Sequence, residues 1–215
     1  MIKPIPHLVA GLLAATLSLG TVSTVQAKTP ADQLIVGMSM INLLSLDPAA
    51  ATGLDVSEVN ANLYDMLLVQ DASAPDTLVP ALAERWEISD DHKTLTFHLR
   101  SGVKFHSGNE LTAQDVIWSL QRVLKLNLAL ASTWKAYGFT ADNVEQQIRA
   151  TDDHTVVIEL ARPTDPMLVL NTLATSPSAF ILDKKEVLKH DKNGDMGGAW
   201  LTTNAAGSGP FVLNA

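Results

Sequence analysis

Two strand–turn–strand patterns constrain the possible folds of this chain more than any other feature of its sequence. Residues 86–100 and 147–161 each contain alternating apolar and polar side chains, which is the period of a β-strand with one buried face. Both patterns reverse at a similar tetrapeptide, Ser89–His92 in the first and Thr151–His154 in the second, whose aspartates can accept hydrogen bonds from the local backbone. We therefore predict two β-hairpins. The residues expected on their buried faces are Leu95, Phe97, Leu99, Val156, Ile158 and Leu160.

Three helices are predicted around these hairpins. Thr112–Asp115 has the form of a capping box, with Asp where Glu or Gln is usual, and apolar residues continue at helical spacing to Leu124. Shorter helices are expected at 167–173 and at 184–189. Asp183 is the predicted N-cap of the last one because its carboxylate can accept the free backbone N–H groups of the first turn.

The segment before the first hairpin is predicted to contain one strand and one helix. The apolar run 34–41 is bounded by polar residues and indicates a buried strand. Residues 46–53 contain proline and glycine and are expected to be irregular. Helical spacing of apolar residues then predicts a helix over 56–69, capped by Asp55 or Ser57 and lying against the sheet.

The C-terminal part is expected to be mostly loop. Residues 191–208 are rich in Gly and Asn, and residues 209–215 have the composition of a strand that is just beginning. Taken together, the expected elements define an α+β fold whose strands lie largely in hairpins.

The first 27 residues have the sequence of a secretory signal peptide. A basic start with Lys3 is followed by the uncharged apolar run 8–20, and small residues precede a predicted cleavage site after Ala27. A retained membrane anchor is the alternative, but glycines and a Ser/Thr-rich end make a poor spanning helix. We therefore expect export, most simply to a bacterial periplasm.

Composition excludes several classes of function. The chain has 23 acidic and 15 basic side chains, a formal charge of −8, which is opposite in sign to a surface that binds a phosphate backbone. Nucleic acid is therefore not an expected partner. The chain has no cysteine, so thiol catalysis, zinc ribbons and iron–sulfur clusters are excluded, and no cofactor is expected.

Candidate catalytic and metal motifs have simpler explanations. Ser101–Lys104 has Ser-x-x-Lys spacing but falls at a strand end, and Gly207–Gly209 lacks the outer glycines of a nucleophile elbow. Asp191–Asp195 superficially resembles a calcium loop, but the acidic ligand expected at its twelfth position is Thr202. The spacing of His92, His98 and His106 is not diagnostic of a metal site, so no metal is predicted.

Two alternative functions remain at this point. One is a periplasmic hydrolase that uses paired carboxylates, although aspartates at solvated turns lack the positioning that catalysis requires. The other is a structural or adhesive module. The carboxylates of the hydrolase alternative are Asp90, Asp91, Asp152 and Asp153.

A long stretch of the chain resembles a known family. Residues Ala83–Val116 resemble the signature of the family 5 extracellular solute-binding proteins of ABC importers, the peptide, nickel and opine group. Further resemblances are at Pro80–Glu84, Asp153–Pro163 and Gly207–Phe211. The chain is similar only to the first two fifths or so of such proteins, so it looks like an N-terminal fragment.

The resemblance implies a fold and a mechanism. The fold is the N-terminal part of a two-lobed, type II-like periplasmic binding protein with an extra small α+β domain. Residues 28–55 would be the first segment of lobe I, 56–200 the accessory domain, and 201–215 the return into lobe I. The implied protein is a monomer that captures a small solute, most simply a di- or oligopeptide. It closes on the solute by a hinge movement and delivers it to an ABC permease in the inner membrane, without catalysis.

The resemblance also implies which residues form the near side of the binding cleft. Side chains and backbone after the first strand would contact the solute, and a glycine there would let the backbone approach it closely. A tryptophan and a tyrosine in a loop between a helix and the second hairpin can form an amphipathic wall at the cleft edge. The predicted ligand-binding residues are Met40, Ala51, Thr52, Gly53, Trp134 and Tyr137. Which solute is bound depends on lobe-spanning residues that usually lie further along such chains.

Overall fold

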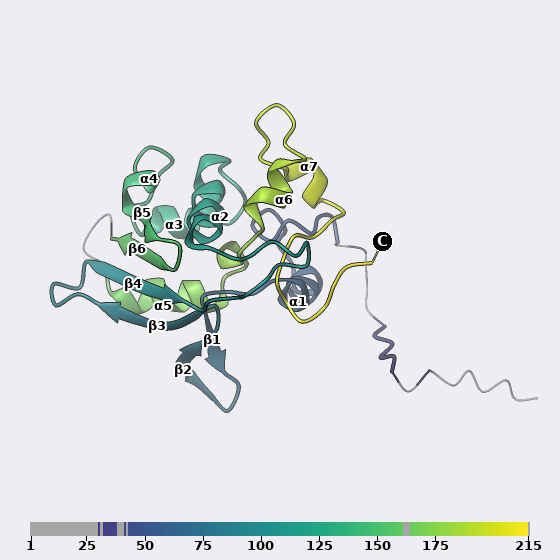
Figure 1. Ribbon diagram of the computed structural model, residues 1–215, viewed down its shortest axis with the longest axis horizontal. Helices are drawn as coiled ribbons and strands as arrows, with labels where there is room; N and C mark the ends of the chain where they lie inside the picture. Colours follow the sequence, from purple (N-terminus) through teal and green to yellow (C-terminus); the bar gives the residue numbers. More distant parts are fainter. Residues whose placement is uncertain (1–29, 31, 38–40, 42, 161–163, 215) are drawn as a thin grey trace, which may run out of the picture. The chain divides into compact units, whose positions relative to one another are not determined.

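The computed structural model describes residues 30, 32–37, 41, 43–160 and 164–214 (Figure 1). The predicted signal peptide lies outside the described residues. The chain divides into two compact units, Met1–Gly37 and Met38–Ala215. In the first unit, residues 32–37 form no helix or strand, and Leu34 and Val36 are exposed. The strand predicted over 34–41 is therefore wrong for 34–37, since an apolar run becomes a strand only beside a partner strand; residues 38–40 lie outside the described residues.

The second unit contains the helices and strands. The helices are α1 Leu54–Leu63, α2 Ala113–Lys125, α3 Ala131–Ala136, α4 Val144–Gln147, α5 Pro166–Thr175, the 3₁₀ helix η1 Pro177–Ala179, α6 Lys184–Leu188 and α7 Gly198–Leu201. The strands are β1 Leu68–Asp71, β2 Ala74–Pro80, β3 Ala83–Ile88, β4 Thr94–Leu99, β5 Ile148–Asp152 and β6 Thr155–Glu159.

The two predicted hairpins are confirmed, and they join into one sheet. Hairpin β3–β4 and hairpin β5–β6 form a four-stranded antiparallel sheet in the order β3-β4-β6-β5. At the junction between the hairpins, Leu95 lies opposite Ile158 and Phe97 opposite Val156, and all four side chains are buried. These cross-strand apolar pairs fix the register of the sheet, because a slip by one residue would turn them toward solvent.

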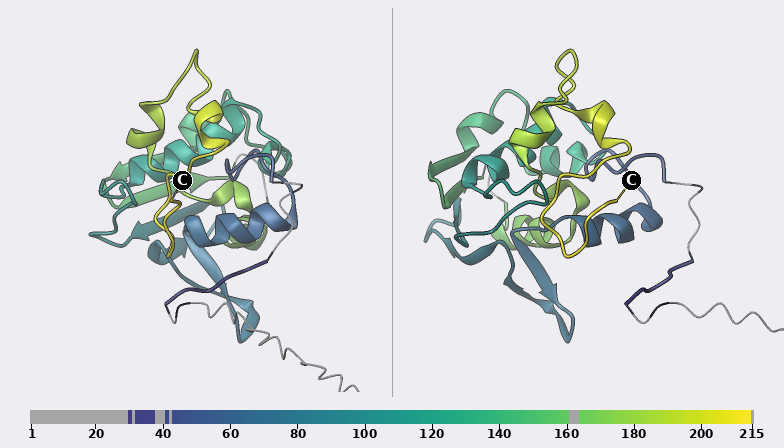
Figure 2. Two further views of the ribbon diagram at one scale, coloured as in Figure 1. Left: turned by 90° about the vertical axis from the view of Figure 1, so that its right-hand side faces the viewer. Right: turned by 45° about the vertical axis from the view of Figure 1, so that its right-hand side comes forward.

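Helix α2 begins at the predicted capping box. The backbone N–H of Thr112 donates to the carboxylate of Asp115 at 2.9 Å, so the box forms with Asp in place of Glu or Gln. The helix contacts β5 and β6, and Figure 1 and Figure 2 show it on one face of the sheet. Its apolar face packs against the sheet and helps to form the larger hydrophobic core.

Two hydrophobic cores are present in the described part of the second unit. The first core contains the buried face of the four-stranded sheet together with residues of α2, α3 and α5. The second core joins the C-terminal end of α1 to α6 and α7. Its buried residues are Leu46, Leu63, Tyr64, Met66, Phe180, Leu182, Val187, Leu201 and Ala206.

Helix α1 differs from its prediction at both ends. It ends at Leu63 and not near residue 69, because Tyr64 takes an extended conformation and the following apolar residues Leu67 and Leu68 pack in the first core as the chain enters β1. Its N-cap is Gly53, and not Asp55 or Ser57. The apolar residues after Leu63 keep a helical spacing, but they are apolar because they pack in the first core as the chain enters β1.

Three smaller features also differ from expectation. The loop predicted over 191–208 contains the short helix α7. The described residues 209–214 form no strand; their backbone instead runs along the end of α1, with the Gly209 N–H donating to Leu63 O at 3.1 Å. The β1–β2 hairpin was not predicted, because β2 is largely exposed on both faces and shows no apolar alternation.

Candidate functional site

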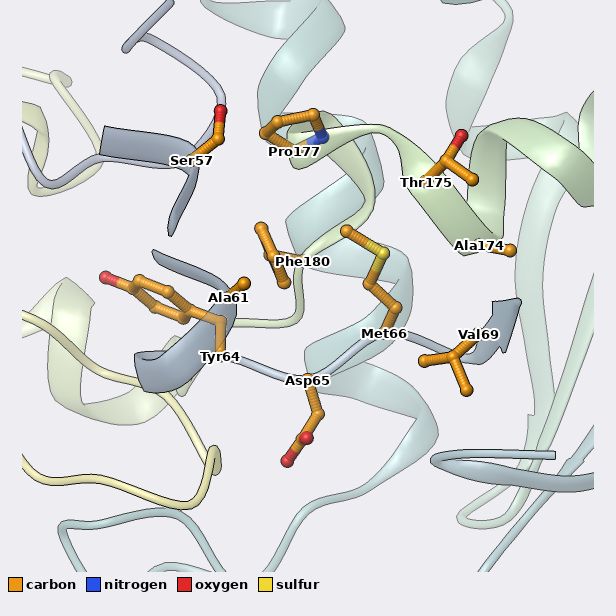
Figure 3. A pocket seen from close by; sticks show the side chains of 10 residues that line it. All are labelled: Ser57, Ala61, Tyr64, Asp65, Met66, Val69, Ala174, Thr175, Pro177 and Phe180. Atoms are coloured by element: carbon orange, nitrogen blue, oxygen red, sulfur yellow. The ribbon is translucent and has the colours of Figure 1, made fainter. Parts of the chain in front are cut away.

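A pocket of about 360 Å³ lies between α1, the segment leading into β1, and the α5–η1 region (Figure 3). Most of its lining is apolar, and the side chains of Ala61, Met66 and Phe180 point toward one another across it. Its lining residues are Ser57, Ala61, Tyr64, Asp65, Met66, Val69, Ala174, Thr175, Pro177 and Phe180. A cavity of this size and composition suits an apolar group of a small ligand.

Tyr64 ties this pocket to the second core. Its side chain is only 1% exposed, its ring lies 5.8 Å from that of Phe180, and its hydroxyl donates to Leu46 O at 3.4 Å. Burial raises the pKa of the Tyr64 hydroxyl well above its ordinary value, because the phenolate would be poorly solvated there. The pocket wall is therefore set by a neutral, packed ring.

Alkaline pH should expose this burial. The folded-state pKa of Tyr64 is raised, so the unfolded chain ionises first as the pH rises. The contribution of Tyr64 to the free energy of unfolding is therefore full below pH 10 and is lost as the pH rises above 10. Between pH 10 and 12 we expect wild type to lose about 1.4 kcal/mol per pH unit more than Tyr64→Phe. Urea denaturation at pH 8, 10, 11 and 12 measures this, with Tyr137→Phe as the control. Parallel pH curves for wild type and Tyr64→Phe would contradict it.

Next to the pocket lies a turn that we call the 47–53 loop, residues Asp47–Gly53. The backbone N–H groups of Ala50 and Ala51 donate to the carbonyl of Asp47 at 3.1 and 3.0 Å. The loop ends at Gly53, whose φ of 152° and ψ of 151° are accessible essentially only to glycine. The hydroxyl of Ser57, a pocket residue, donates to Gly53 O at 2.8 Å. The loop therefore ends beside the pocket.

The structure gives the predicted ligand-binding residues different environments. Ala51 is half-buried and Thr52 and Gly53 are exposed, whereas Met40 lies outside the described residues. The loop also contacts the start of α3, where Leu130 N–H donates to Ala49 O at 3.4 Å. The structure thus brings the loop together with the helix that carries the predicted aromatic residues.

Trp134 and Tyr137 lie at a short helix and its C-cap, and not in the expected loop. Trp134 is fully buried in the first core, and its indole N–H donates to Ser178 Oγ at 2.9 Å. The Tyr137 side chain is half-buried, and its hydroxyl shares a hydrogen bond of 2.7 Å with Thr172 Oγ1. Both side chains therefore connect α3 to the α5–η1 region in this structure.

No local sequence pattern identifies the pocket itself. Its lining comes from residues 57–69 and 174–180, which the fold brings together across more than a hundred positions. The only sequence signal was the apolar spacing of α1, and that pattern indicates core packing as readily as a ligand pocket.

The four carboxylates of the hydrolase alternative do not form one site. Strands β4 and β6 are antiparallel, with Thr94 opposite Glu159 and His98 opposite Thr155. The turns that precede these strands therefore lie at opposite ends of the sheet, about 13 Å apart or more at the strand rise of 3.3 Å per residue. This separation is too large for one pair of carboxylates to act together on a bond.

Two of these aspartates, Asp91 and Asp152, accept hydrogen bonds that favour their charged form. Hydrogen bonds from Ser89 and from the Lys93 backbone lower the pKa of Asp91, and a backbone hydrogen bond from His154 lowers the pKa of Asp152. A general acid needs the opposite shift. Their geometry suits turn formation, which is what the sequence indicated.

The described residues offer neither a metal-ligand cluster nor a membrane-spanning helix. Among them, no group of three or more His, Asp or Glu side chains is placed to hold a metal ion. None of the helices in this part of the chain has the length and apolar character needed to cross a membrane.

Comparison with known proteins gives one consistent result. Residues 77–215 match the profile of the bacterial extracellular solute-binding proteins, family 5. The chain is 30% identical to the periplasmic oligopeptide-binding protein OppA of Escherichia coli K12, over 95% of this chain and 39% of OppA. The chain therefore spans about two fifths of the length of this relative.

Solved structures with a similar fold come from the same class of proteins. A periplasmic binding protein of Helicobacter pylori, in complex with the peptide STSA, matches with a TM-score of 0.64 and 29% identity, covering 80% of this chain and 34% of that one. A binding protein of A. tumefaciens R10 in complex with mannopinic acid matches with a TM-score of 0.67 and 28% identity, covering 81% and 33%. The α+β fold thus corresponds to part of a periplasmic binding protein.

Proposed function

Because the chain belongs to the family 5 bacterial extracellular solute-binding proteins, we propose that it forms the N-terminal part of a periplasmic protein that binds a di- or oligopeptide. The family consists of solute-binding proteins and not of enzymes, which agrees with the separated carboxylates described above. The peptide would be delivered to an ABC permease in the inner membrane. The observation that carries the proposal is the similarity to a periplasmic relative whose name states that it binds oligopeptides.

The proposed protein has two lobes that close on the solute by a hinge movement. We assign residues 28–55 and 201–215 to lobe I and residues 56–200 to the accessory domain. A cleaved leader that ends at Ala27 would direct the chain to the periplasm. Support for export comes from the periplasmic location stated for the relative.

We propose that the near side of the cleft is formed by Met40 and by Ala51, Thr52 and Gly53. Two observations support this assignment. Thr52 and Gly53 are exposed, and Gly53 has no side chain to keep a ligand away from its extended backbone. Trp134 and Tyr137 remain predictions as cleft-edge residues, and the burial of Trp134 disfavours its assignment. Backbone groups and water would make most contacts, because a varied peptide cannot be matched by fixed side chains.

Nuclear magnetic resonance of the full two-lobed protein, titrated with dipeptides, tests the proposal. We expect the amide chemical shifts of Ala51–Gly53 to change at millimolar dipeptide. Thr52→Val should bind the dipeptide about tenfold more weakly, because it removes the hydroxyl that would hydrogen-bond to the peptide. Thr77→Val on the exposed strand β2 is the matched control and should bind as wild type does. Mannopinic acid serves as the competing ligand class. Absence of shift changes with any peptide, or changes with mannopinic acid alone, would refute peptide binding.

A further inference from the structure

A buried ion pair holds the 47–53 loop against α2. The Arg122 guanidinium and the Asp47 carboxylate form two parallel hydrogen bonds, Nη2 to Oδ2 at 2.7 Å and Nη1 to Oδ1 at 3.1 Å. The Arg122 side chain is 1% exposed and that of Asp47 is 2% exposed. A bidentate arginine–carboxylate pair fixes orientation as well as distance, which an ammonium group does not do.

The same guanidinium connects a third segment of the chain. Its Nε donates to the backbone carbonyl of Met196 at 3.0 Å, and its cationic carbon lies 5.9 Å from the centre of the Trp118 ring. The residue just before the loop also contacts the 196–202 segment, since Leu46 N–H donates to Thr202 O at 3.2 Å. One side chain therefore links the loop, helix α2 and the segment that contains α7.

Asp47 in turn determines the backbone of the loop. Its carboxylate accepts the Ala49 N–H at 3.2 Å, and its carbonyl accepts those of Ala50 and Ala51. If Arg122 were absent, the Asp47 charge would be buried without a partner, which is strongly unfavourable. The carboxylate would then move toward water, and the turn that depends on it would change shape.

Stability alone is a poor explanation for this pair. Two charges lose their hydration when they are buried, and an apolar pair of similar size is often as stable or more stable. A buried pair does select one arrangement of the segments that it joins. Here that arrangement places the exposed Thr52 and Gly53 next to the pocket of Figure 3, whose residue Ser57 bonds to Gly53 O.

We propose that Arg122 is a positioning residue for ligand binding, which acts through Asp47 to fix the 47–53 loop in the conformation that receives the ligand. The inference rests on the proposed function, because it requires the loop to contact the peptide. Arg122 does not touch the ligand. It limits the conformations of the free loop, and so lowers the cost of ordering the loop when the peptide binds.

The test compares Arg122→Lys with Arg149→Lys. Arg149 pairs with Glu159 on the exposed side of the sheet and is the matched control. In the ligand-free chain, we expect Arg122→Lys to raise hydrogen exchange at the Ala50 and Ala51 amides about tenfold relative to amides of β4, since local opening precedes exchange. We expect its dipeptide dissociation constant to rise by about tenfold, and both readouts to stay within about twofold of wild type in Arg149→Lys.

A second variant covers the case in which Arg122→Lys fails to fold. The double substitution Asp47→Asn with Arg122→Gln removes both charges together and leaves amides that can still bond. We expect this variant to fold. Its Ala50 and Ala51 amides should exchange faster than those of wild type, and it should bind the dipeptide more weakly.

Two results would overturn the inference. Unchanged loop exchange in a folded variant would do so, and so would raised exchange with unchanged affinity. A wild-type two-lobed protein that binds no peptide would refute the proposed function instead, so the two failures are distinguishable.

Discussion

Gly207→Ala will lower the free energy of unfolding by about 3 kcal/mol or more, because overpacking against a fixed backbone is costly. A Cβ atom at this position would lie 1.9 Å from the carbonyl oxygen of Leu63 and 2.7 Å from the ring of Tyr64. Leu63 O accepts the Gly209 N–H at 3.1 Å, and Tyr64 is buried in the second core. Neither neighbour can move without losing these contacts, so the whole 207–209 segment would have to leave the end of α1.

Gly198→Ala is the matched control for this substitution. A Cβ there would make only an ordinary contact, 3.6 Å from the Arg122 side chain, and the residue lies at the start of α7. Alanine is favoured over glycine in helices, so we expect a change within about 0.5 kcal/mol or a slight stabilisation. Urea denaturation of both variants measures the difference. If Gly207→Ala and Gly198→Ala were equally stable, the 207–209 segment could not lie as close to α1 as described.

The close approach also explains why glycines occupy both ends of the Gly207–Gly209 motif. The Ser208 hydroxyl donates to the carboxylate of Asp65 at 2.8 Å, which attaches the segment to the residues that follow α1. His106 Nε2 lies 2.8 Å from Gly209 O and secures the other side of the segment. The glycines are therefore required by packing against α1, and the exclusion of a nucleophile elbow agrees with this arrangement.

Features set by neighbours in the sequence could be predicted. The hairpins follow from alternation between residues a few positions apart, and the Thr112–Asp115 capping box and the Asp183 cap each bond within one helical turn. These contacts form wherever the local segment forms, so tertiary structure does not need to be known. The two turns differ only in detail, with Asp91 accepting the Lys93 N–H in one and Asp152 the His154 N–H in the other.

Features set by distant partners could not be predicted. The end of α1 depends on where Leu67 and Leu68 find the first core, and the Asp47–Arg122 pair joins residues 75 positions apart. No local pattern distinguishes Arg122 from an exposed arginine on the polar side of a helix. The candidate site belongs to this second group, because its loop and its pocket are shaped by contacts between segments far apart in the chain.

Trp134→Ala will lower the free energy of unfolding by about 3–5 kcal/mol, the range for removing a large aromatic side chain from a core. The indole is fully buried, packs edge-on against Phe139 with ring centres 5.9 Å apart, and donates to Ser178 Oγ. Truncation would leave a cavity and remove the hydrogen bond that joins α3 to η1. Urea denaturation measures the loss, and Trp200→Ala is the control, since that half-buried ring stacks on His190 and should cost clearly less.

Trp134→Phe separates the two possible roles of this residue, because it retains most of the apolar volume and removes only the indole N–H and one ring. If Trp134 is a core residue, this variant loses about 1–3 kcal/mol of stability, and its dipeptide affinity stays within about twofold of wild type at a temperature where both are folded. If Trp134 is a wall of the ligand cleft, the affinity falls and the stability hardly changes. The burial of the indole and its bond to Ser178 favour the first result, so a loss of affinity without a loss of stability would contradict the packing of α3 described above.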